Sequence, residues 1–145
     1  MRNLNTDPIV FALSNPYPEI LPDKALQYRS DCIIATSRPE HANQINSMMA
    51  FPFIFRAVLD TMASDVNEDM LLAAANAMAD LAKEPVPESV ISAYDKSNRD
   101  FTFGPNYIIP TPFDSRLLET VSCAVAKIAQ ETGIAKHQIM DMDQY

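Results

Sequence analysis

Asparagine side chains in two short polar segments are the groups of this chain best suited to bind a ligand. Ser14 and Asn15 come directly after an apolar run and just before Pro16, and Asn46 and Ser47 lie beyond a second apolar run. An asparagine amide offers two N–H donors and one carbonyl acceptor. It can therefore hold a ribose hydroxyl, a carboxamide or a substrate carboxylate.

Each segment also has a purely structural interpretation. Asn15 can form an Asx-turn, in which its side chain bonds to the backbone ahead of a proline. Asn43 and Asn46 lie three residues apart, so they can share one helix face that points back to the sheet edge, or they can cap a core helix. The spacing alone leaves the binding and the structural interpretations open.

The two apolar runs predict the strands that position these side chains. Residues 9–13 and 32–36 are apolar without alternation, which is typical of parallel strands covered on both faces. Residues 107–109 are a candidate for a third strand. Because ligands bind outside the carboxyl ends of strands in open α/β sheets, Ser14 and Asn15 stand at a favoured position. We expect an α/β fold with two or three parallel strands flanked by helices.

Helical patterns fill much of the remaining chain. We expect helices over residues 23–28, 53–62, 67–83, 87–94 and from 114 onward. Pro52, Asn67 and Asp114 mark helix starts, and Gly133 is expected to end the last helix. The predicted apolar face of the 67–83 helix contains Leu71, Ala74, Ala75, Met78 and Ala82. Residues 137–145 are expected to form a ragged tail.

The composition limits the partners of the chain. It has 145 residues, of which 48% are hydrophobic, and a net charge of −8. We expect no nucleic acid and no membrane as partner, because an acidic surface repels phosphate groups. No apolar run approaches the ~20 residues that cross a bilayer, and no signal peptide is evident, so we expect a cytoplasmic protein. Cys32 and Cys123 follow apolar patterns and are expected to be buried thiols.

The glycine content gives the sharpest exclusion. Gly104 and Gly133 are the two glycines of the chain. A dinucleotide-binding fingerprint needs three closely spaced glycines, and a P-loop needs two in one short loop. This chain therefore has no glycine loop that cradles phosphates. His41 and His137 are isolated, and no Cys or His spacing resembles a metal site. We therefore expect no metal ligand and no catalytic residue in this chain.

Several segments in register resemble malic enzymes of the bacterial type. They are VFALSNP with PEI, IIATSRPE, NQINSMMAFPFIFRAVLD, NEDM, and FGPNYIIPTPFDSRLLETVSCAVAKIAQETGIA. The resemblance runs from about residue 8 to residue 136. It implies that residues 1–136 are the C-terminal part of a Rossmann-like NAD(P)-binding domain, followed by a tail over 137–145. Malic enzymes oxidise malate with NAD or NADP and decarboxylate the product to pyruvate.

The resemblance implies binding roles for the two asparagine segments. Asn15 corresponds to an asparagine beside the nicotinamide ribose and the substrate, and Ser14 belongs to the same cofactor-binding turn. The family's Asn-Asn pair, whose second member contacts the substrate, corresponds to Asn46 and Ser47. The chain therefore departs from the family pattern where malate is held, because a serine hydroxyl is shorter than an amide. Ala57 also replaces a glycine that is usual in the family.

The resemblance further implies that most catalytic groups of the family lie upstream of the matching stretch. These groups are a lysine and a tyrosine for acid–base steps, an acidic trio for Mg²⁺ or Mn²⁺, and the glycine fingerprint. The metal polarises the keto oxygen and stabilises the enolate formed on loss of CO₂. We do not expect this chain to catalyse the reaction alone.

Two hypotheses follow from this incomplete set of groups. In the first, the enzyme is split: a separate malic enzyme catalytic half supplies the catalytic domain and the glycine loop, and this chain contributes Asn15 and Asn46. A homo-oligomer is the other partner that we consider. In the second, the chain is a non-catalytic remnant or protein-interaction module that keeps the fold. The choice between NAD and NADP stays open, because the residues that read the ribose 2′ position lie upstream in the family.

Overall fold

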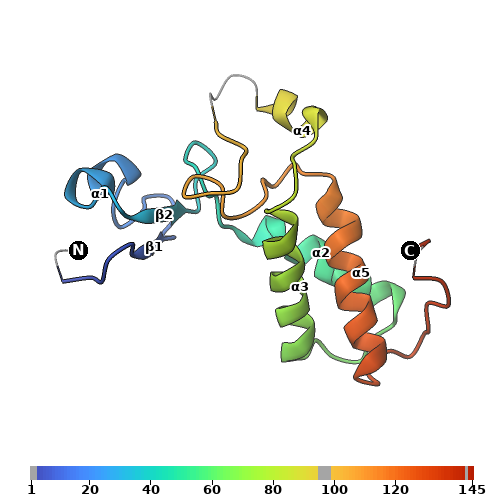
Figure 1. The fold of residues 1–145 in the computed structure, drawn as a ribbon. Helices are drawn as coiled ribbons and strands as arrows, with labels where there is room; N and C mark the ends of the chain where they lie inside the picture. The colour runs from blue at the N-terminus through green and yellow to red at the C-terminus, as the bar shows by residue number, and fades with distance from the viewer. Residues whose placement is uncertain (1–2, 95–98, 143) are drawn as a thin grey trace. The chain divides into compact units, whose positions relative to one another are not determined.

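The structure is a computed structural model that describes residues 3–94, 99–142 and 144–145 (Figure 1). The chain forms two compact units, and each unit is built from two separate stretches. Unit 1 comprises Met1–Asn46 and Ala82–Thr111, and unit 2 comprises Ser47–Leu81 and Pro112–Tyr145. Strands are found in unit 1 and the longer helices in unit 2.

Unit 1 contains a two-stranded parallel sheet with a crossover helix. β1 (Ile9–Ala12) pairs in parallel with β2 (Ile33–Thr36), and α1 (Pro22–Tyr28) connects the two strands. Ala25 of α1 is fully buried and packs in one small cluster with Cys32 at the start of β2. The parallel pair and its connecting helix confirm the predicted α/β class.

The described sheet has two strands, within the predicted two or three, and its first strand is less covered than expected. Ile9 and Phe11 of β1 are 62% and 56% exposed, whereas Ala12 is buried. Alternate residues of a strand share a face, so one face of β1 is uncovered within the described chain. The expected third strand does not form at Tyr107, because its backbone N–H and carbonyl both bond to Gly104 in a tight turn, at 2.9 and 3.3 Å.

Unit 2 is a helical core centred on the last helix. It contains η1 (Ser47–Met49), α2 (Phe51–Asp60), α3 (Glu68–Leu81) and α5 (Arg116–Glu131). α5 packs along both α2 and α3, which have few contacts with each other (Figure 1). The fully buried residues of α5 are Leu117, Val121, Val125, Ala126 and Ala129. Among the described helices, none is long and apolar enough to cross a membrane.

The predicted helix starts are found close to their expected positions. Pro52 lies in the first turn of α2, and Pro87 directly precedes α4 (Glu88–Ala93) in unit 1. At the start of α5, the Asp114 carboxylate accepts a hydrogen bond from the backbone N–H of Arg116 at 3.1 Å. Proline suits the start of a helix because the backbone N–H that it lacks would have no intrahelical partner there.

Side-chain and glycine caps fix two further helix ends. The Asn67 side chain accepts a hydrogen bond from the N–H of Met70 at 2.9 Å, which caps α3. Gly133 has a φ of +75° just after α5, and the N–H of Ile134 bonds to the carbonyl of Ala129 at 3.2 Å. This arrangement is a Schellman motif. Both ends confirm the sequence predictions.

The buried face of α3 agrees with the predicted one in part. Ala74 and Ala82 are buried and Met78 packs on the core, as predicted, whereas Leu71 is 47% exposed. Met70, outside the predicted face, is buried. Apolar residues surround much of this alanine-rich helix, so its periodicity did not fully decide which face meets α5.

The C-terminal residues pack on unit 2, contrary to the expected ragged tail. The backbone N–H groups of Lys136 and His137 bond to the carbonyl of Thr61 at 3.0 and 2.9 Å. The Tyr145 hydroxyl donates to the Asp60 carboxylate at 2.8 Å. These contacts hold the tail against the end of α2.

Exposed apolar side chains follow one another along α2 and the residues just before and after it, and we call this row the α2 stripe. It consists of Met48, Phe51, Phe55, Leu59 and Met62. The rings of Phe51 and Phe55 stack on each other with centroids 5.8 Å apart. Contiguous apolar surface of this kind usually marks a contact with another part of a protein.

Candidate ligand-binding site

The turn that follows β1 is closed by hydrogen bonds to one carboxylate. The backbone N–H and the hydroxyl of Ser14 both donate to Glu19, at 3.2 and 2.6 Å. The hydroxyl bond lowers the pKa of Glu19 below its usual value. Ser14 is therefore committed to shaping the turn, and its predicted contact with a cofactor stays a prediction.

Asn15 lies within this turn and is exposed at the carboxyl end of β1. The peptide bond between Asn15 and Pro16 is cis. Among the described residues, the hydrogen bonds of this turn are made by Ser14, Glu19 and Arg38, and the Asn15 amide takes no part in them. The amide is thus open to solvent at the sheet edge where α/β proteins bind ligands.

Arg38 ties the turn after β1 to the turn after β2. Its Nη1 donates to the carbonyl of Pro16 at 3.1 Å, and its other edge forms an ion pair with Glu40. The Arg38 guanidinium lowers the pKa of the Glu40 carboxyl. The Arg38 backbone N–H bonds to the buried hydroxyl of Thr36 at 3.2 Å, and that hydroxyl contacts Nδ1 of His41 at 2.9 Å.

A cavity of about 150 Å³ lies between these two turns. Residues 16–18 and Leu21 line it from the first turn, and Arg38, Glu40 and His41 line it from the second. One wall is largely apolar and the other carries charge and hydrogen-bonding groups. The cavity and the Asn15 amide therefore share the carboxyl end of the two-stranded sheet.

Asn43 is a structural residue, and the helix face it was predicted to share with Asn46 does not form. Asn43 has a φ of +53° and is 6% exposed. Its side-chain nitrogen donates to the carbonyls of Ile34 and Pro105 at 3.1 and 2.7 Å. Its side-chain oxygen accepts from the N–H of Ile108 at 2.9 Å. The Asn43 amide thus makes three hydrogen bonds, two as a donor and one as an acceptor.

Asn46 and Ser47 stand where the chain passes from one unit to the other. Asn46 is the last residue of the first stretch of unit 1 and is half-buried. Ser47 is the first residue of unit 2 and is exposed, and its carbonyl accepts the N–H of Ala50 at 3.2 Å. The substrate-binding roles of Asn15, Asn46 and Ser47 stay predictions.

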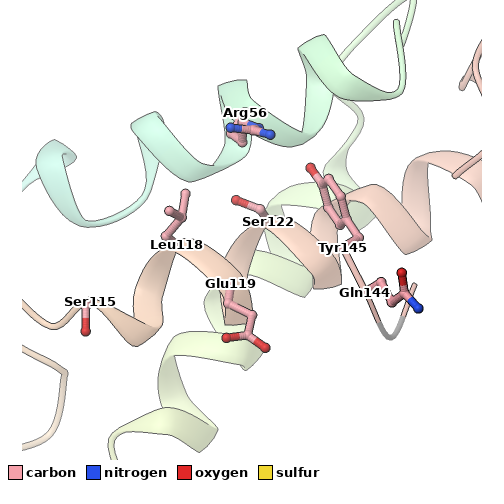
Figure 2. A pocket seen from close by; sticks show the side chains of 7 residues that line it. All are labelled: Arg56, Ser115, Leu118, Glu119, Ser122, Gln144 and Tyr145. Atoms are coloured by element: carbon pink, nitrogen blue, oxygen red, sulfur yellow. The ribbon is translucent and has the colours of Figure 1, made fainter. Parts of the chain in front are cut away.

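A second cavity, of about 400 Å³, lies in unit 2 and had no signal in the sequence. Arg56 of α2 and Glu119 and Ser122 of α5 line it together with Tyr145; Figure 2 shows Ser122 on the side of α5 nearer to Arg56 and the Glu119 side chain directed away from Arg56. Arg56 forms an ion pair with Asp60, which also accepts the Tyr145 hydroxyl. Residues 85 positions apart in the chain thus meet here, which no local pattern can predict.

The carboxylate and phenol beside this cavity have shifted pKa values. Burial favours the neutral form of Asp60, but hydrogen bonds from Arg56 and Tyr145 outweigh it and lower the pKa of Asp60. Burial, and then the hydrogen bond to Asp60, raise the pKa of Tyr145 well above its usual value. The Arg56–Asp60 ion pair and the Tyr145–Asp60 hydrogen bond therefore hold the tail beside α2.

Two features that a complete nucleotide site would use, a metal-binding cluster and a glycine cradle, are not found among the described residues. These residues contain no cluster of three or more His, Cys, Asp or Glu side chains that could hold a metal ion. Gly104 lies in a turn where a Cβ would have room, and Gly133 ends a helix, so neither forms a phosphate cradle at a helix start. The exposed Asn15 amide fits a ribose hydroxyl, a carboxamide or a carboxylate.

Comparisons with known proteins point to one family. Residues 1–94 match the sequence model of a family described as malic enzyme, NAD binding domain. The chain is 52% identical over 136 residues to the NADP-dependent malic enzyme of Halomonas elongata, covering 94% of this chain and 32% of that protein. It is 49% identical over 145 residues to the NADP-dependent malic enzyme of Rhizobium meliloti, covering 100% of this chain and 19% of that protein.

A solved structure agrees with these sequence matches. The crystal structure of malic enzyme from Pyrococcus horikoshii superimposes with a TM-score of 0.78 and 34% identity, covering 97% of this chain and 28% of that chain. The chain thus spans between 19% and 32% of the length of the two curated relatives.

Proposed function

Because the chain belongs to the malic enzyme family, as part of its NAD(P)-binding domain, we propose that it supplies ligand-holding groups to a malic enzyme reaction. The reaction is the NAD- or NADP-dependent oxidative decarboxylation of malate to pyruvate. The observation that carries the proposal is the exposed Asn15 amide, held at the carboxyl end of β1 by a turn that other residues fix. We assign residues 1–136 to the C-terminal part of the NAD(P)-binding domain and residues 137–145 to a tail.

The proposed contribution of the chain is to hold and orient its ligands. The Asn15 amide donates to the nicotinamide ribose or to malate, which fixes the approach of the two reactants for hydride transfer. Asn46 donates to the substrate, and Ser47 offers a shorter hydroxyl beside it. Because the described residues do not fit a metal ion, the proposal assigns this chain no metal-dependent step.

Uncovered apolar surface in both units supports completion of the site by more protein. Ile9 and Phe11 are exposed on β1, and the α2 stripe is exposed on unit 2. Burying such side chains against a partner is favourable by ~25 cal/mol per Å² of apolar surface removed from water. We propose the remaining malic enzyme sequence, on a separate chain, as that partner, and a second copy of this chain as the alternative partner of the exposed apolar surface.

A complementation experiment tests this function. The chain is mixed with the Halomonas elongata enzyme from which the matching stretch of 136 residues has been deleted. Native mass and malate-dependent reduction of NAD or NADP, followed by absorbance, are then measured. We expect a stable complex that oxidises malate.

Single substitutions then locate the function in the proposed site. Asn15→Ala should lower kcat/KM by about 10- to 100-fold, because a hydrogen bond to a charged group contributes ~1.5–3 kcal/mol. The matched control is Asn76→Ala, which removes an exposed amide from α3. Equal activity of these two variants would contradict the assignment of Asn15.

The alternative function is that of a non-catalytic interaction module, and Ser47 is the residue that favours it. A serine stands where the family resemblance implies a substrate-binding amide. Ser47→Asn in the complemented enzyme discriminates between the two. A functional half should show a lower KM for malate when the amide is restored, whereas an interaction module should assemble without any response to malate.

A further inference from the structure

We propose that Arg38 is a positioning residue that holds the Asn15 turn in the conformation that presents its amide to a ligand. The inference deepens the proposed function of Asn15 and rests on it. Arg38 itself lies at the end of β2 and bonds to the residue that follows Asn15.

The Arg38 guanidinium uses two of its edges at once. Nη1 donates to the carbonyl of Pro16 at 3.1 Å, while Nε donates to both oxygens of Glu40 at 3.1 and 3.2 Å and Nη2 completes the ion pair. A planar fork with five donors can bridge two acceptors in fixed directions. A lysine ammonium is a single point of charge and lacks that geometry, so lysine should not replace Arg38.

We call the hydrogen bonds from Arg38 to Pro16 and Glu40 the Arg38 clamp. This clamp is also anchored in the sheet, through the backbone of Arg38. The Arg38 backbone N–H bonds to the Thr36 hydroxyl at 3.2 Å, and Thr36 is fully buried at the end of β2. Thr36 pairs with Ala12, the last residue of β1. Arg38 is therefore anchored to the same two strands that carry the Asn15 turn.

The Asn15 turn is consequently fixed on both sides of the asparagine. On one side, Ser14 bonds to Glu19 through its N–H and its hydroxyl. On the other side, Pro16 bonds to Arg38. Loss of Arg38 leaves the second side held only by the chain, so the Asn15 amide must be ordered again each time a ligand binds. The expected loss of affinity is roughly 5- to 30-fold, the factor that corresponds to fixing one residue.

The first test measures the order of the Asn15 turn in the full chain without any ligand. NMR relaxation of ¹⁵N-labelled protein gives an order parameter for the Asn15 amides. We expect a value near 0.85 in the wild type and below about 0.6 in Arg38→Gln and Arg38→Lys. The control is Arg56→Gln, which breaks an arginine–carboxylate pair on α2 and should leave the Asn15 signals unchanged.

Some results would overturn the inference. Unchanged order at Asn15 in a folded Arg38→Gln protein would do so. If that variant does not fold, Glu40→Gln serves instead, because it keeps the guanidinium and weakens only one of its anchors. In that variant the Arg38–Pro16 bond remains, so we expect a partial loss of order at Asn15; full order at Asn15 in a folded Arg38→Lys protein, which keeps the charge and lacks the fork, would count against the clamp.

A double-mutant cycle in the complemented enzyme separates positioning from general structural support. Arg38→Gln should lower kcat/KM by roughly 5- to 30-fold in the wild-type background, and by much less when Asn15 is already alanine, because it acts through Asn15. Equal effects in both backgrounds would show that Arg38 does not act through Asn15.

The two proposals can fail independently. If Asn15→Ala has no effect on kcat/KM while Arg38→Gln still loosens the turn, the proposed function of Asn15 fails and the clamp stands. If Asn15→Ala is harmful and Arg38→Gln changes neither the order of the turn nor kcat/KM, the clamp alone fails.

Discussion

Replacing Asn43 by alanine should destabilise unit 1 more than any exposed substitution. The Asn43 side chain joins the end of β2 to the 105–108 loop through three hydrogen bonds, to Ile34, Pro105 and Ile108. The residue is nearly buried and has a positive φ. Asparagine tolerates that conformation, whereas alanine does not favour it.

The magnitude follows from these contacts. Each hydrogen bond contributes about 1 kcal/mol net, and alanine at a positive φ costs ~1 kcal/mol, so Asn43→Ala should lose about 4 kcal/mol. Asn43→Asp keeps the size and the acceptor oxygen but removes both donors. It should therefore lose about 2 kcal/mol or more, because two carbonyls then face a carboxylate.

Hydrogen exchange at the Ile108 amide is the most direct assay. That N–H bonds to the Asn43 side chain, so its exchange should become at least ~100-fold faster in Asn43→Ala, since each 1.36 kcal/mol is a factor of ten. Urea unfolding followed by circular dichroism gives the accompanying loss of stability. Local exchange is the better measure because a chain with two units need not unfold in one step.

The matched control is Asn76→Ala, which removes an exposed asparagine from α3 and should change stability by no more than ~0.5 kcal/mol. A loss below ~1 kcal/mol in Asn43→Ala, with Ile108 exchange as slow as in the wild type, would refute the reasoning. The 105–108 loop would then be held by its own turn and not by Asn43.

Three further predictions test other parts of the structure. Gly133→Ala should lower the free energy of unfolding by ~1 kcal/mol because of its positive φ, whereas Gly104→Ala should be nearly neutral in the same urea titration. Tyr145→Phe should reduce the loss of stability above about pH 10. The raised pKa of Tyr145 means that the folded state keeps a proton that the unfolded state releases above about pH 10, so the free energy of unfolding of the wild type falls as pH rises. The same dependence of the free energy of unfolding on pH in both proteins would contradict this. Asn67→Ala should lose ~1 kcal/mol on thermal unfolding because α3 loses its cap.

The sequence predicted those features whose causes lie within a few residues. The apolar runs located β1 and β2, Asn67 marked the start of α3 and Gly133 the end of α5. Each depends on a backbone preference or a hydrogen bond between near neighbours. The position of the turn at Asn15 was likewise predicted from the end of a strand, and its ligand-binding role stays a prediction.

The sequence did not predict features made by distant partners. Asn43 bonds to residues 62 and 65 positions away, so its structural role has no local signal. Tyr145 meets Asp60 across 85 positions, and polar neighbours hide the apolar contacts of the tail. Arg38 resembles any charged turn residue until the Pro16 carbonyl, 22 positions away, is seen beside it.

The central place of α5 in unit 2 has a consequence for synthesis of the chain. α2 and α3 are made first, yet each packs mainly on α5. From the end of α3 at Leu81 to the end of α5 at Glu131, a ribosome adding ~5–20 residues per second needs about 2 to 10 s. During that interval both earlier helices expose the surfaces that α5 later covers. The nascent chain is therefore most prone to aggregate, and most dependent on chaperones, while residues 82–131 are being translated.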